Sequence, residues 1–140
     1  MIPRQARKFR RKTARIVHEL VRRGIPVAAD TEINICDYPE VKTLIAILQF
    51  LDNGSQDIPL AAALKSALGS VTDAELSAVR LASGPKEAFY LACERYTQEK
   101  TDALSEKLRA FYARAARYRL FMNVKGAAEI LTMLLSETGM

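Results

Sequence analysis

Apolar residues recur at intervals of three and four along most of the chain, and this spacing is typical of amphipathic helices. Residues 37–52 are apolar nearly all round, so we expect this helix to be buried at the centre of the core. The sequence therefore predicts an all-α fold, an irregular bundle of several helices. The predicted helices span residues 4–23, 37–52, 58–67, 72–82, 86–96, 102–118 and 127–137.

Side chains that can cap helices mark several of the predicted starts. Asp37 with Glu40, and Thr72 with Glu75, have the spacing of a capping box, in which each side chain bonds a free amide of the first turn. Asp57 follows an Asn-Gly-Ser turn and is expected to cap the helix that begins at the next residue. These signals place three of the helix boundaries.

A short extended segment interrupts the helical pattern near the amino terminus. Gly24 is expected to end the first helix, and Pro26 restricts Ile25 to extended backbone. Residues 27–29 are then apolar, but they are too few to form a sheet without partners. We therefore expect a mainly helical chain with a short N-terminal strand remnant.

The charge of the chain is concentrated at its amino end. The formal net charge is +5, whereas the first 23 residues hold nine basic side chains against Glu19 alone, which gives +8. Such a segment can neutralise the phosphates of a nucleic acid without reading its sequence. The alternative is a solvated helix face, and the sequence leaves both open. The residues predicted to contact DNA are Arg7, Lys8, Arg11, Lys12 and Arg15.

The sequence lacks the patterns that catalysis requires. A phosphate-binding loop needs Gly-Lys followed by Ser or Thr, and Gly84-Pro85-Lys86 is the nearest approach. His18 is the only histidine, so no triad or histidine-based metal site can be built within the chain. Cys36 and Cys93 are expected to be reduced, partly buried thiols. We therefore predict no catalytic, cofactor-binding or metal-binding residue.

Composition restricts the remaining classes. The chain has 140 residues, of which 49% are hydrophobic and 26% charged, an ordinary globular composition. No apolar run has the length of a membrane span, and the basic amino terminus is not followed by the apolar stretch of a secretory signal. We expect an intracellular helical domain that acts through binding.

One long run resembles a known family. It is "VKTLIAILQFLDNGSQDIPLAAALKSALGSVTDAELSAVRLA", in which Leu51-Asp52-Asn53, Gln56 to Ala62, Leu64-Lys65-Ser66 and Ala74-Glu75-Leu76 match the family pattern. The run is similar to the AddA-type helicase-nuclease subunit of the UvrD/Rep-like superfamily 1 helicases. The matching part of that subunit is where an accessory subdomain, called 2B, is inserted into the second motor domain.

Flanking segments extend the resemblance to roughly residues 14–139. Upstream, "ARIVHELVRRGIPVAAD" is similar to the part of the second motor domain that leads into the insertion. Downstream, "AAEILTMLLSETGM" is similar to a later 2B helix, and Tyr118-Arg119 stands where the family often has Trp-Arg. Gly54, Lys65 and Ala67 depart from the family pattern, which has proline, arginine and proline at these places.

The resemblance implies a function for a larger protein. Residues 1–30 would be the end of a motor-domain element, and residues 31–140 a helical 2B-like accessory subdomain. The chain would be a fragment of a DNA helicase/nuclease acting in double-strand break repair and recombination, in which ATP and Mg²⁺ are bound outside this segment.

The same resemblance implies partners and a location. The expected partners are duplex DNA, contacted through its backbone, the remaining helicase domains and, where the organism has one, a second nuclease subunit, with no membrane contact. The location would be the bacterial cytoplasm, on the nucleoid. The alternative is a free-standing helical adaptor whose basic helix meets an acidic protein surface.

Overall fold

The computed structural model describes residues 15–27 and 35–139, and its contacts divide the chain into the units Met1–Asn34 and Ile35–Met140. In the first unit residues 15–22 are helical. Gly24 then takes a positive φ of 73°, and the amide of Ile25 donates to the carbonyl of Leu20 at 3.0 Å, which closes the helix as predicted. The backbone of residues 25–27 has no regular secondary structure. Residues 4–14 and 28–30 of the predicted helix and strand lie outside the described residues.

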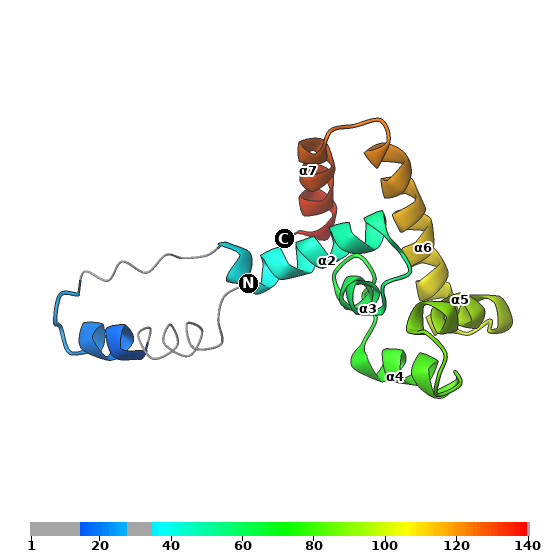
Figure 1. Ribbon diagram of the computed structural model, residues 1–140, viewed down its shortest axis with the longest axis horizontal. Helices are drawn as coiled ribbons and strands as arrows, with labels where there is room; N and C mark the ends of the chain where they lie inside the picture. The colour runs from blue at the N-terminus through cyan, green and yellow to red at the C-terminus, as the bar shows by residue number, and fades with distance from the viewer. Residues whose placement is uncertain (1–14, 28–34, 140) are drawn as a thin grey trace. The chain divides into compact units, whose positions relative to one another are not determined.

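The second unit is built of helices alone (Figure 1). No strand occurs in residues 15–27 or 35–139, so the predicted all-α class is confirmed there. The helix after Gly126 ends at Gly139, which adopts the left-handed conformation, as the sequence indicated. In chain order the elements are η1 (Ile35–Asp37), α2 (Pro39–Asp52), α3 (Asp57–Lys65), α4 (Asp73–Leu81), α5 (Phe89–Glu99), α6 (Ala103–Met122) and α7 (Ala127–Thr138).

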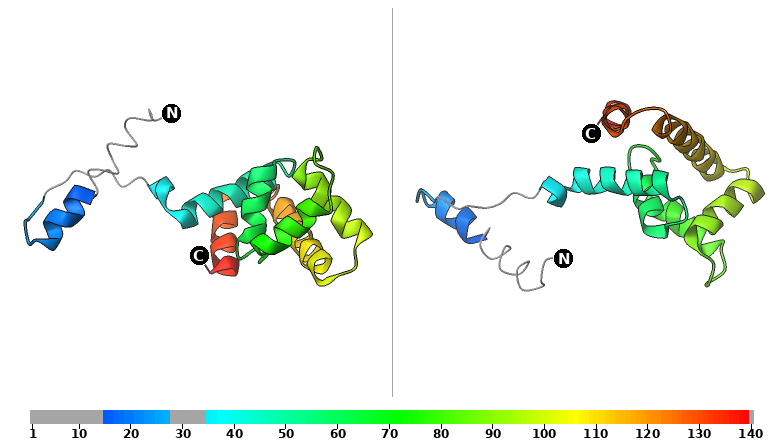
Figure 2. Two further views of the ribbon diagram at one scale, coloured as in Figure 1. Left: turned by 90° about the horizontal axis from the view of Figure 1, so that it is seen from below. Right: turned by 45° about the horizontal axis from the view of Figure 1, so that its top comes forward.

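Helix α6 is the longest element of the second unit and contacts α2, α5 and α7 (Figures 1 and 2). The Phe111 ring stacks on Phe50 of α2, with the ring centroids 5.1 Å apart. This pair joins the two halves of the unit. The predicted periodicity of α6 is confirmed, because the residues that it buries are Leu104, Ser105, Leu108, Phe111, Ala115 and Tyr118.

Helix α2 differs from its prediction in two respects. Its buried residues, Ile47, Phe50 and Leu51, all lie in the C-terminal half, although the apolar pattern predicted burial along the whole helix. The predicted capping box at Asp37 is not formed, because Asp37 belongs to η1 and Tyr38 is the N-cap, without a side-chain bond. Proline at the first helical position starts α2 in its place.

The other predicted capping box is confirmed at the start of α4. The Glu75 amide donates to Thr72 Oγ1 at 3.2 Å, and the Thr72 amide donates to Glu75 Oε2 at 2.8 Å. Lys107 of α6 donates to the other carboxylate oxygen at 2.7 Å and, as the main cause, lowers the pKa of Glu75. The cap of α4 is therefore also its link to α6.

Candidate functional site

The connection between α2 and α3 carries the run that resembles a known family, and Arg119 of α6 holds its first half. The guanidinium donates to the carbonyls of Leu51, at 3.0 Å, and Phe50, at 3.1 Å, and lies 5.1 Å from the centre of the Phe50 ring. These carbonyls are among those that a helix end leaves unpaired. A Cβ atom at Gly54 would come within 2.6 Å of Arg119 Nη2. The glycine therefore leaves room for the arginine.

Asp57 serves a different helix from the one predicted. Helix α3 begins at Asp57 itself, and its N-cap Gln56 makes no side-chain bond, so the predicted local cap is wrong. The carboxylate instead accepts from the amides of Phe89 at 2.9 Å and Tyr90 at 3.1 Å, which open α5. It thus supplies the cap that Ala88, the N-cap residue of α5, cannot provide.

Sequence reasoning missed this role because the bond spans more than thirty positions. One signal could have indicated it. The residue at the start of α5 is an alanine, which has no side-chain acceptor, so the first amides of that helix had to find a partner elsewhere. A nearby aspartate on another element was therefore to be expected.

The arginines of α6 bond to the protein itself. Arg109 donates to the carbonyls of Thr97 and Lys100, at 2.6 to 3.0 Å, and so closes the C-terminal end of α5. Arg114 donates to the carbonyl of Leu68 at 3.0 Å, and Arg117 pairs with Glu137 of α7. With Arg119, these side chains join α6 to its neighbours and do not form an unengaged basic face.

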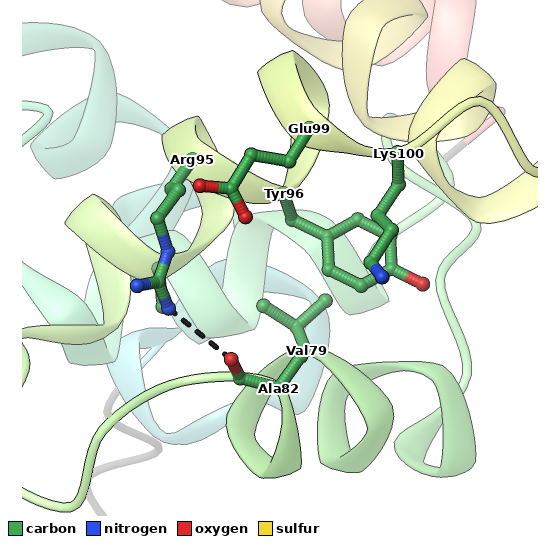
Figure 3. A pocket seen from close by; sticks show the side chains of 7 residues that line it. Val79, Ala82, Arg95, Tyr96, Glu99 and Lys100 are labelled. Carbon is green, nitrogen blue, oxygen red and sulfur yellow. Dashed lines mark hydrogen bonds between the residues drawn. The ribbon is translucent and has the colours of Figure 1, made fainter.

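A cavity of about 190 Å³ lies between α4 and α5 (Figure 3). Val79 and Ala82 of α4 face Arg95 and Tyr96 of α5 across it. Arg95 donates to the carbonyl of Ala82 at 3.2 Å and to Glu87 at 2.8 Å. Its charge is thus already compensated. The arrangement brings no nucleophile next to a general base, so it offers no catalytic chemistry.

A second cavity, of about 170 Å³, lies between α2, α6 and α7, and we call it the α2–α7 pocket. Most of its lining is apolar, in contrast to the first cavity. The side chains that line it are Leu48, Met122, Lys125, Ala127, Ile130 and Leu131.

The buried nucleophile of the second unit is shielded from reaction. Cys93 is fully buried, and burial, with a smaller contribution from the charge of Asp57, raises the pKa of its thiol to about 12. The neighbouring Tyr112 hydroxyl has no hydrogen-bond partner among the described residues, and burial raises its pKa as well. Cys36, by contrast, is exposed. Cys93 is therefore a packing residue, as its apolar context predicted.

Neither a metal site nor a membrane-spanning helix is found in the described parts of the chain. Residues 15–27 and 35–139 contain no group of three or more His, Cys, Asp or Glu side chains that could hold a metal ion. Over the same residues no helix is both long and apolar enough to cross a bilayer. The site chemistry is thus limited to hydrogen bonds, ion pairs and apolar contact.

The predicted DNA-binding residues fall in the first unit. Arg15 is exposed at the start of the described helix, and His18 is exposed on the same helix. The other four, Arg7, Lys8, Arg11 and Lys12, lie outside the described residues. Their role in DNA binding therefore stays a prediction.

Comparison with known proteins finds similarity to one kind of protein. No family model matches the chain. The chain is 36% identical over 121 residues to a protein of Clostridium acetobutylicum, 32% over 126 residues to one of Bacillus velezensis, and 37% over 123 residues to one of Thermoanaerobacter. Each carries the name of the first, AddA-type subunit of an ATP-dependent helicase/nuclease. The matches cover 86 to 89% of this chain but 10% of each relative.

Proposed function

Because this chain belongs to the family of AddA-type ATP-dependent helicase/nuclease subunits, we propose that it is a helical accessory segment of such a protein. ATP hydrolysis and DNA cleavage then belong to parts of the parent protein outside these residues. The packed unit supports this proposal, because its polar side chains cap helices and pair elements and do not assemble a reactive site. The segment would correspond to the 2B subdomain and its junction with the second motor domain.

The distribution of charge carries the DNA-binding part of the proposal. In the second unit most basic side chains already pair with a carboxylate or a backbone carbonyl, as Lys65 does with Asp73 at 2.7 Å. The excess positive charge lies in the first 23 residues. We infer that this basic segment contacts the phosphate backbone of duplex DNA, as an element of a repair and recombination enzyme.

Binding of duplex DNA at two salt concentrations tests this function. We expect the 140-residue chain to bind a duplex of unrelated sequence at low salt and to lose affinity steeply as salt rises, because bound phosphates release counterions. Absence of binding at low salt, or binding that does not respond to salt, would contradict the DNA role. ATP turnover by the purified chain would contradict the absence of catalytic residues.

A free-standing protein adaptor is the second candidate, and the exposed apolar side chains of the second unit favour it. Val124 is 84% exposed and Leu120 is 69% exposed, both near the end of α6. An adaptor should capture one defined protein at a fixed stoichiometry whether or not nucleic acid has been digested. A helicase segment should lose its partners when DNA is removed, except for the remaining domains of its own parent.

A further inference from the structure

We propose that the α2–α7 pocket receives a large apolar side chain from another domain of the same parent polypeptide. The proposal rests on the proposed function, because it requires a parent protein of the length of the relatives. Nothing in the capping and pairing described above uses this pocket. It is therefore a separate feature of the second unit.

The burial of α2 indicates that a covering surface exists. Its sequence is apolar nearly all round, yet Ile45 is 37% exposed and the pocket residue Leu48 is only partly buried. Figure 1 shows that the N-terminal half of α2 extends beyond α3 and α6. A helix of this composition is typical of a position with protein on all sides. The uncovered half thus fits a contact that forms in a larger assembly.

The size of the pocket selects the kind of occupant. Pockets for small molecules commonly enclose about 300–1,000 Å³. At about 170 Å³, with a lining that is apolar apart from Lys125, the pocket is too small for such a ligand. It can instead hold one anchoring side chain, in the way that a few buried apolar anchors supply most of the binding energy of an interface.

The length of the relatives favours an occupant from the same polypeptide. The chain spans about one tenth of each relative, so most of the parent lies outside it. Domains joined in one chain meet at a high effective concentration, about millimolar for short flexible linkers, and a single apolar anchor is then sufficient for docking. A second copy of this chain would lack that advantage and would need a larger contact area.

Hydrogen exchange on a chimera tests the proposal. This chain replaces the matching segment in the Clostridium acetobutylicum protein, and exchange is compared with the isolated chain in the absence of DNA. We expect amides of residues 41–48 and 127–135 to exchange about tenfold more slowly in the chimera, which corresponds to about 1.4 kcal/mol. Equal exchange in the two proteins would overturn the proposal.

Two matched variants make the test specific. Leu131→Glu places a charge in the pocket wall, whereas Leu81→Glu places one on α4, where the side chain is 87% exposed. The first should abolish the protection in the chimera and the second should leave it. If the isolated chain is a dimer that only Leu131→Glu dissociates, the occupant is a second copy and the proposal is wrong.

Two further measurements keep the outcome interpretable. If the chimera does not fold, the natural Clostridium protein and its excised matching segment give the same comparison, with the same two readings. Salt-dependent duplex binding by the isolated chain, together with unchanged exchange in the chimera, would reject the docking proposal and leave the proposed function standing. Loss of duplex binding with protected pocket amides would do the opposite.

Discussion

The Asp57 carboxylate accepts a hydrogen bond from the backbone amide of Phe89 at 2.9 Å, and so the first residue of α3 caps the start of α5. Arg119 acts in the same way at the other end of this connection, on the last carbonyls of α2. The run between α2 and α3 is therefore held by contacts to α5 and α6, and its most distinctive residues act in folding.

Replacing Asp57 by Ala should reduce the free energy of unfolding by about 1–2 kcal/mol, because two amides of α5 lose their acceptor. The exposed Asp52, at the end of α2, provides the matched control, since Asp52→Ala removes the same charge. Urea denaturation of the three proteins measures the difference. Equal midpoints for the two variants would show that the Asp57 bonds do not contribute.

Arg119→Lys should destabilise the chain by about 1–2 kcal/mol although the charge is kept. A lysine cannot present two N–H groups to the carbonyls of Phe50 and Leu51 in the planar arrangement that the guanidinium provides. The same change at the exposed Arg22 of the first unit is the control. If both variants melt at the temperature of the parent chain, charge alone accounts for the role of Arg119.

Gly69→Ala should cost about 1–3 kcal/mol, because its Cβ would lie 2.3 Å from the carbonyl oxygen of Leu64, which also accepts the amide of Val71. At Gly84 a Cβ meets no atom within 4 Å, so Gly84→Ala should change stability by less than about 0.5 kcal/mol. Thermal melting of the pair decides the matter. A similar loss for both would point to backbone entropy and not to the steric contact.

Acid should weaken the packed unit partly through Asp102, whose pKa is lowered chiefly by the Tyr96 hydroxyl, which donates to it at 2.6 Å. A lowered folded-state pKa gives stability above the unfolded value, 3.8, that is lost as pH falls through the folded value. Asp102→Asn should therefore flatten the fall of stability below about pH 4. Glu94→Gln, at an exposed position of α5, is the control and should keep the slope.

Local patterns predicted the helices well, because the information for each lies within its own residues. The α6 stripe from Leu104 to Tyr118 and the Thr72 box of α4 follow from spacing alone. The partners of Asp57 and Arg119 could not be predicted, since each bonds a backbone group far along the chain. The site follows the same rule, because burial of Cys93 depends on which helices meet around it.

The salt dependence of duplex binding tests the proposed DNA contact most directly, when two variants of equal charge are compared. In the first, Arg7, Lys8, Arg11, Lys12 and Arg15 become Gln; in the second, the exposed Lys42, Lys65, Lys86, Lys100 and Lys125 become Gln. We expect the first variant to bind far more weakly and with a flatter salt slope, whereas the second retains most of both. Equal losses in the two variants would show that only net charge matters, and would contradict a specific role for the basic segment.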